Sequence, residues 1–144
     1  MVADSVPLVM RTIRAEMRSH RSPDLSVPHF RTLAYLHRHP GASLSDVAAH
    51  IGLTLPSISK MVDRLVVREL VTRRSGPQDR RRICLELTPQ GESTYQAAAS
   101  ATRARLAERL AALSPDERAT IGQAMRTIKV LFGAERADDN ETST

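Results

Sequence analysis

Apolar side chains recur at helical spacing through the first forty residues of the chain. One face of a first segment carries Val6, Val9, Met10, Ile13, Met17 and His20, which predicts a helix of roughly 15 residues. The stretch RSPDLSVP at residues 21–28 interrupts this pattern. A second helix is predicted from about Pro28, and its apolar face carries Phe30, Leu33, Ala34 and His37. The stretch HPGAS at residues 39–43 ends it, because proline cannot continue a helix.

Two short helices with typical capping residues are predicted next. Ser43 with Asp46 three residues later has the pattern of a capping box, and Gly52 stands where a helix often ends. Thr54 can then cap another helix, whose apolar face carries Ile58, Met61, Val62, Leu65 and Val66. Two short helices joined by a few residues with a glycine are typical of a helix-turn-helix, although a plain helical hairpin has the same spacing.

The polar face of the second short helix favours the helix-turn-helix. It carries short side chains and cations, mostly toward its N-terminal half: Pro56, Ser57, Ser59, Lys60 and Arg64. Its one acid is Asp63, whereas a merely solvated helix more typically carries Glu and Lys pairs. A recognition helix reads base edges with groups of this kind near its N-terminus. These five residues are therefore predicted to contact DNA.

A basic β-hairpin is predicted directly after this helix. Residues 70–74 and 82–88 flank a polar turn, and Ile83, Leu85 and Leu87 alternate with polar neighbours, so these three should face the core. A hairpin in this place is a wing, whose arginines can enter the minor groove. Asp79 is expected to hold one arginine by a bidentate ion pair. The predicted DNA contacts here are Arg73, Arg74, Asp79, Arg80, Arg81 and Arg82.

The net positive charge of the chain lies in the same region. The formal net charge is +5, and residues 54–82 contain eight Lys and Arg against three Asp and Glu. This segment therefore accounts for the whole net charge. A run of charges is most often a solvated face, but a localised basic patch is also typical of a protein that binds a polyanion.

Composition narrows the class of protein further. A chain of 144 residues fits one domain, and an aromatic fraction of 3% with no tryptophan favours an aliphatic, helical core. No apolar run approaches the roughly 20 residues of a membrane span, and the first twenty residues do not resemble a signal peptide. We therefore expect a cytoplasmic protein without a membrane partner. The single cysteine, Cys84, excludes an internal disulfide and a multi-cysteine zinc site.

Enzymatic and metal-binding patterns are missing from the sequence. It contains no His-Glu-x-x-His motif, no glycine-rich phosphate loop and no nucleophile elbow. We therefore predict no catalytic residue, no metal ion and no cofactor. Cys84 alternates out of phase with Ile83 and Leu85, and is interpreted as an ordinary strand residue rather than a redox sensor.

The helix-turn-helix and the hairpin together carry a family resemblance. Residues 43–74 followed by 79–91 resemble the multiple-antibiotic-resistance-regulator (MarR) family of winged-helix repressors. The wing of that family has an Asp-x-Arg motif, matched by Asp79 and Arg81, and then a strand ending in Leu-Thr-x-x-Gly, matched by Leu87, Thr88 and Gly91. One departure is Glu69, where the family usually has a glycine that supplies a left-handed helix cap.

Two more helices are predicted after the wing. Thr88 and Pro89 begin a long helix, and a capping box of Ser114, Pro115 and Glu117 begins the last one. Ile121, Met125, Ile128 and Phe132 form the apolar face of that last helix. Such faces can pack within one chain, but a partner subunit is the simpler cover, and the resemblance implies dimerisation through the N- and C-terminal helices.

These observations lead to one interpretation of the chain. It is predicted to be mainly α, with a winged helix-turn-helix at residues 28–88, dimerisation helices at 1–22 and 89–133, and a disordered acidic tail at 134–144. We expect a homodimeric, sequence-specific transcriptional regulator that binds double-stranded DNA, represses from a pseudo-palindromic operator and is released by a small-molecule effector. The alternative is a sequence-tolerant architectural DNA-binding protein.

The resemblance also implies a place for the effector. It would bind in the cleft between the dimerisation helices and the winged helix, near Met17, Phe30 and His37. The same three side chains serve equally well as core residues.

Overall fold

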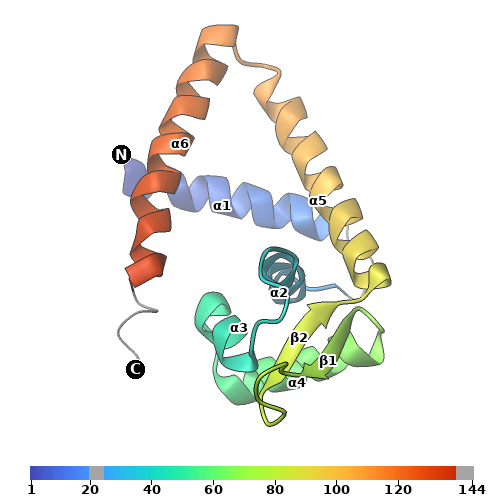
Figure 1. Ribbon diagram of the computed structural model, residues 1–144. Coiled ribbons are helices and arrows are strands. Elements are labelled where there is room, and N and C mark those ends of the chain that lie inside the picture. Colours follow the sequence, from blue (N-terminus) through green and yellow to red (C-terminus); the bar gives the residue numbers. More distant parts are fainter. Residues whose placement is uncertain (20–24, 139–144) are drawn as a thin grey trace. The chain divides into compact units, whose positions relative to one another are not determined.

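The described part of the chain forms six helices and one β-hairpin in two compact units. The computed structural model describes residues 1–19 and 25–138, apart from the side chains of residues 2, 17, 19 and 133–138. The first unit, residues 1–105, contains α1 (Val2–Ser19), α2 (Val27–Arg38), α3 (Leu44–Ile51), α4 (Leu55–Val67), β1 (Val71–Ser75), β2 (Ile83–Leu87) and most of α5 (Pro89–Leu110) (Figure 1). The second unit contains the end of α5 and α6 (Pro115–Asp138).

One hydrophobic core holds the winged helix-turn-helix together. Helices α2, α3 and α4 and both strands contribute side chains that are at most 2% exposed, namely Leu33, Leu36, Val47, Ile58, Val62, Leu65, Val71 and Leu85. Burying one aliphatic side chain of this size stabilises a fold by about 1.5–3 kcal/mol. This core confirms the predicted mainly α, winged helix-turn-helix fold.

The predicted capping residues begin and end the two short helices. The Ser43 side chain accepts a hydrogen bond from the backbone N–H of Asp46, and the Asp46 carboxylate accepts one from the N–H of Ser43. Gly52 ends α3 in the left-handed conformation, with φ of 78°. Thr54 caps α4 by accepting from the N–H of Ser57. The capping assignments made from sequence are confirmed at all three positions.

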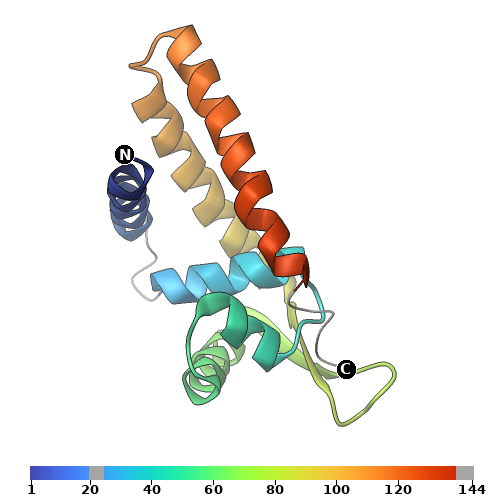
Figure 2. The ribbon, with the colours of Figure 1, turned by 90° about the vertical axis from the view of Figure 1, so that its left-hand side faces the viewer.

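The hairpin departs from the predicted alternation at one position. The strands are antiparallel and pair Val71 with Leu87 and Ser75 with Ile83, and Figure 2 shows them projecting from the helices. Leu85 is fully buried, but Ile83 is 46% exposed, so its predicted burial was wrong. The physical reason is that the hydrophobic core does not extend under the tip of the hairpin. Leu85 bridges to Ala42 in the connection between α2 and α3, whereas Ile83 lies two residues farther toward the tip.

The end of α4 adopts the left-handed cap that the family resemblance implies, without the glycine. Glu69 has φ of 58° and is the only non-glycine residue with a positive φ in residues 1–19 and 25–138. The N–H of Glu69 donates to the carbonyl of Val66, and the N–H of Leu70 donates to the carbonyl of Leu65. This pair of hydrogen bonds is a Schellman motif.

The residues after this cap are clamped to the start of α5. The backbone N–H of Thr88 donates to the carbonyl of Leu70 at 3.1 Å, and the Thr88 hydroxyl donates to the carbonyl of Glu69 at 2.5 Å. The same hydroxyl accepts from the N–H of Gly91, which lies in the first turn of α5. A Cβ atom at Gly91 would lie 1.9 Å from the carbonyl oxygen of Leu70, so no side chain fits there. The Leu-Thr-x-x-Gly motif is thus the contact between β2, α5 and the exit of α4.

The terminal helices are longer than the sequence pattern predicted. Helix α1 has 18 residues, and α6 continues to Asp138 through residues that were assigned to the tail. The capping box of α6 is present, since the N–H of Ser114 donates to the carboxylate of Glu117 and lowers the pKa of that carboxyl group. His20 and residues 139–144 lie outside the described residues. Among the described helices, none combines the length and the apolar composition of a membrane span.

The strained cap at Glu69 gives a stability prediction. We expect Glu69→Gly to raise the free energy of unfolding by about 0.5–1 kcal/mol. A left-handed L-residue costs roughly 1–2 kcal/mol, and the greater freedom of glycine in the unfolded chain offsets part of this gain. Denaturant unfolding at one fixed protein concentration measures the difference. Glu69→Ala is the control, because alanine keeps the backbone strain. A free energy of unfolding for Glu69→Gly that is equal to or lower than that of the wild type would contradict the assigned conformation.

Candidate nucleic-acid interface

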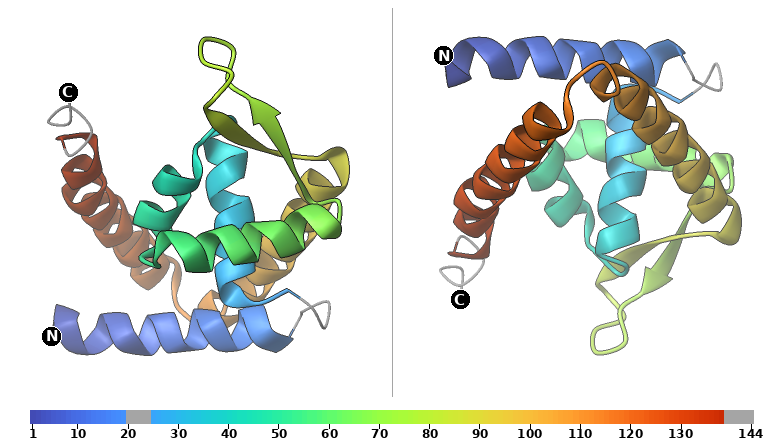
Figure 3. Two further views of the ribbon diagram at one scale, coloured as in Figure 1. Left: turned by 90° about the horizontal axis from the view of Figure 1, so that it is seen from below. Right: turned by 90° about the horizontal axis from the view of Figure 1, so that it is seen from above.

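Helix α4 presents its predicted recognition face to solvent. Pro56, Ser57, Lys60 and Arg64 are exposed, and Ser59 is half-buried. The opposite face of the helix holds Ile58, Met61, Val62 and Leu65 in the core. In the left-hand view of Figure 3, α4 lies in front of the other helices of the first unit. The amphipathic pattern thus brings all five predicted residues to the surface of one helix.

The tip of the wing is closed by hydrogen bonds within its own backbone. The N–H of Gly76 donates to the carbonyl of Arg82 at 2.6 Å, and the N–H of Arg82 donates to the carbonyl of Asp79 at 3.0 Å. The Asp79 carboxylate accepts from the backbone N–H of Arg81 at 2.9 Å. The expected bidentate pair of Asp79 with a guanidinium is therefore wrong. An aspartate readily bonds the backbone two residues on, and here this bond shapes the turn.

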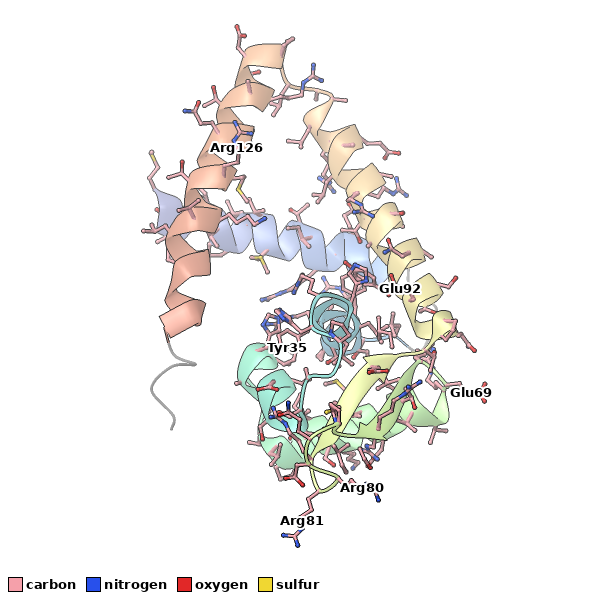
Figure 4. All side chains as sticks on the ribbon, viewed as in Figure 1. Tyr35, Glu69, Arg80, Arg81, Glu92 and Arg126 are labelled. Atoms are coloured by element: carbon pink, nitrogen blue, oxygen red, sulfur yellow. The ribbon has the colours of Figure 1, made fainter. Side chains whose placement is uncertain are left out.

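The arginine side chains at the tip extend away from the fold. Figure 4 shows Arg80 and Arg81 projecting from the end of the hairpin, on the side of the first unit where α4 also lies. Both residues are exposed. The carboxylate of Asp79 bonds the backbone of the turn, whereas the side chain of Arg81 extends away from it. The two residues of the Asp-x-Arg motif therefore do not pair with each other through their side chains.

Three other arginines of the basic segment, residues 54–82, have carboxylate partners. Arg73 lies 2.5 Å from Asp63, Arg74 lies 3.3 Å from Glu86, and Arg82 lies 3.9 Å from Asp46, each measured from nitrogen to oxygen. By contrast, Lys60, Arg64, Arg80 and Arg81 have no carboxylate oxygen within 4.0 Å in the part of the chain that the structure describes. These four positive charges, unpaired among the described residues, thus lie on α4 and at the wing tip.

Two of these ion pairs connect the wing to the helix-turn-helix. Asp63 belongs to α4 and Arg73 to β1, whereas Asp46 caps α3 and Arg82 precedes β2. Exposed pairs of this kind stabilise a fold by at most about 1 kcal/mol each, so they orient the hairpin more than they hold it. Neither pair was predicted from the sequence. Asp63 could have suggested a partner, because it is the one acid on a cationic helix face.

A histidine takes part in the capping box at the start of α2. The Nδ1 atom of His29 accepts a hydrogen bond from the backbone N–H of Ser26 at 3.1 Å. Burial, together with the positive charges of Arg68 and Arg64, lowers the pKa of His29. The cap therefore uses the neutral ring. As the pH falls below 6.5, the ordinary histidine pKa, and through the lowered value, protonation removes this contribution to stability.

The predicted effector residues lie in contacts between α2 and α5. Phe30 and His37 both pack against Tyr95, with ring centroids 5.7 and 4.6 Å apart. The Nδ1 atom of His37 lies 2.9 Å from Oε1 of Glu92, and hydrogen bonds from Gln96 and then His37 lower the pKa of Glu92. Two of the three predicted residues, Phe30 and His37, thus meet at Tyr95, a residue that was not predicted from the sequence. The side chain of Met17 lies outside the described residues.

His39, His50 and Cys84 form no metal site with the other described residues. Tyr35 packs between His39 and His50, with ring centroids 4.6 and 4.5 Å away. Cys84 is a half-buried free thiol on β2. Within residues 1–19 and 25–138, no group of three or more His, Cys, Asp or Glu side chains is arranged to hold a metal ion.

Comparisons with known proteins agree with this geometry. Residues 24–82 match the model of the MarR family. The chain is 28% identical over 98 residues to the uncharacterized HTH-type transcriptional regulator YfiV of Bacillus subtilis, an alignment that covers 68% of this chain and 61% of that protein. The first three curated relatives are matched over only about half to three fifths of their length.

Solved structures match over nearly the whole chain. The crystal structure of RV1404 from Mycobacterium tuberculosis is 25% identical, with a TM-score of 0.80, and the match covers 92% of this chain and 89% of that one. The transcriptional repressor CouR, bound to a 23-mer DNA duplex, is 26% identical, with a TM-score of 0.70, and the match covers 89% of this chain and 92% of that one. The family match falls on α2 to α4, β1 and the wing tip, where the motifs and the fold agree, so this part of the chain is a winged helix-turn-helix similar to that of the MarR family.

Proposed function

We propose that this chain is a sequence-specific, DNA-binding transcriptional regulator. The observation that carries the proposal is the set of exposed cations without a carboxylate partner in the described residues, Lys60, Arg64, Arg80 and Arg81, on α4 and the wing tip. A helix of this size fits the major groove, and a loop beside it fits the minor groove. Cations on both elements are therefore suited to binding duplex DNA. The DNA duplex bound by the related repressor CouR supports the same partner, and a cytoplasmic location goes with it.

In this proposal α4 is the recognition helix. Ser57, Ser59 and Lys60 lie in its N-terminal half, where hydroxyl and ammonium groups reach base edges. Arg64 lies one turn farther along and contacts phosphate. Arg80 and Arg81 at the wing tip enter the adjacent minor groove, while the ion pairs of Arg73 and Arg82 orient the hairpin.

The proposal includes a homodimer. Exposed large apolar side chains occur on α1, namely Val6, Leu8, Val9 and Met10, and separately on α6, namely Ile121, Met125, Val130, Leu131 and Phe132. Apolar faces of this extent on helices are typical of association surfaces, and a second copy is the proposed cover. A two-fold dimer places two copies of α4 in successive major grooves about 34–36 Å apart, which requires a pseudo-palindromic operator.

We further propose that the regulator represses transcription and is released by a small molecule. The repressor named among the solved relatives supports the direction of regulation. Phe30 and His37 contact Tyr95 on α5, which itself is clamped to the exit of α4 through Gly91. A ligand that displaced Tyr95 would therefore disturb α5, the helix whose first turn lies against the exit of the recognition helix.

The wing is tested by removing one arginine. Arg81→Ala should weaken binding to the preferred duplex by about 1–3 kcal/mol, which is typical of a specific arginine contact, without unfolding the protein. Titration of a fluorescent duplex measures the affinity, and thermal unfolding verifies the fold. Arg103→Ala is the matched control, because it removes the same charge from an exposed position of α5 and should change affinity little. Unchanged affinity of a folded Arg81→Ala protein would exclude the wing from the interface.

The direction of α4 in the groove is tested by two cations. Arg64→Ala should lower affinity for all duplexes and reduce the slope of log K against log salt by about one, since it removes one phosphate contact. Lys60→Ala should instead change which sequence is selected from a random library. Titrations at several salt concentrations and selection experiments measure the two effects. If Arg64→Ala alters base preference and Lys60→Ala does not, the helix is oriented differently.

The dimer is tested on an exposed apolar residue of α6. Met125→Asp places a charge where apolar contact is required, and because Met125 is 54% exposed in one chain, the monomer itself should still fold. Analytical ultracentrifugation should show dissociation, with weaker DNA binding. Gln123→Asp on the same helix is the control and should remain dimeric. A Met125→Asp protein that stays dimeric would show that α6 does not form the interface by this face.

A further inference from the structure

Leu55 is an exposed apolar side chain at the very start of α4. It is the first residue of the helix, directly after the Thr54 cap, and it remains 48% exposed. The equivalent first residue of α3, Leu44, packs against the hydrophobic core. The two helices therefore begin alike in sequence, but only one uses its leading leucine for the fold.

The neighbouring leucine stands at a position where helix capping gives a reason for an apolar residue. Leu53 precedes the Thr54 cap, and Ile58 is the fourth helical residue, which are the two positions of a hydrophobic staple. The 44% exposure of Leu53 agrees with partial cover at such a position. The first helical residue has no such capping position, so the packing of the described residues does not account for a leucine at position 55.

The surroundings of Leu55 indicate the chemistry of its partner. The exposed residues that follow it are Pro56, Ser57 and Lys60, and the unpaired cations of the interface share this helix and the wing. Cationic surroundings favour a polyanion over an apolar protein surface. The major groove of DNA is lined by polar base edges, and its characteristic apolar group is the C5 methyl of thymine.

We propose that Leu55 is a specificity-determining residue that packs against the C5 methyl group of a thymine in the bound duplex. This inference rests on the proposed function, because it requires α4 to enter the major groove with its N-terminal end first. Leu55 then selects thymine over cytosine through apolar contact, while Ser57, Ser59 and Lys60 supply the hydrogen bonds. Burial of one methyl-sized group corresponds to about a fourfold change in affinity.

The experiment replaces thymine by uracil, which removes only the methyl group. The wild-type protein first selects a preferred duplex from a random library. Each thymine of that duplex is then replaced singly by deoxyuridine, and the affinities of wild type and Leu55→Ala are measured for every duplex at one salt concentration. Val67→Ala is the matched control, because Val67 is 83% exposed at the opposite end of α4. Thermal unfolding verifies that both variants fold.

The expected result is a coupling between one thymine and one side chain. At least one uracil substitution should weaken wild type and Val67→Ala by about fourfold, and should have no effect on Leu55→Ala. The inference is overturned if no uracil substitution weakens the wild type, or if every uracil effect persists in Leu55→Ala. Loss of affinity in Leu55→Ala that is equal for thymine and uracil would indicate contact with sugar, and also overturns it. A library that yields no preferred sequence would refute the proposed function itself.

Discussion

The carbonyl group of Leu70 is the point at which α4, the wing and the long helix α5 meet. It accepts a hydrogen bond from Thr88, and Gly91 lies so close to it that no side chain could be accommodated there. The strained cap at Glu69 directs the chain from α4 into β1 at this same place. Because the contact is between backbone groups, it holds for many core sequences, provided that position 91 remains glycine. The orientation of α4 relative to the hairpin follows from it.

The positive charge of the basic face also depends on which of its cations pair with carboxylates of the same chain. The sequence concentrates eight basic residues in one segment, yet Arg73, Arg74 and Arg82 lie beside carboxylates of the fold. The pairs of Arg73 and Arg82 orient the hairpin on the helix-turn-helix, and the pair of Arg74 joins the two strands of the hairpin. The cations of the basic face that carry no such partner in the described residues lie on α4 and at the wing tip. A basic patch read from sequence therefore overstates the number of groups that are free to meet DNA.

Local features of the sequence predicted most of the fold. Capping residues such as Ser43 and Thr54 act within three positions, and the apolar stripe of α4 depends only on helical period, so both could be read without tertiary information. Contacts between distant segments could not. The exposure of Ile83 depends on how far the core extends under the hairpin, and the Asp63–Arg73 pair joins residues ten positions apart on different elements. The role of Asp79 was misassigned because a turn geometry decided between two acceptable partners.

In the proposed function, the face formed by α4 and the wing tip recognises a particular DNA sequence rather than DNA in general. An architectural protein would need only the basic charge, whereas a regulator must discriminate. The most direct measurement is the ratio of affinities for the selected duplex and for a scrambled duplex of the same length and composition, at one stated physiological salt concentration. The account predicts a ratio of about a thousand or more. A ratio near one, with tight binding to both duplexes, would contradict it.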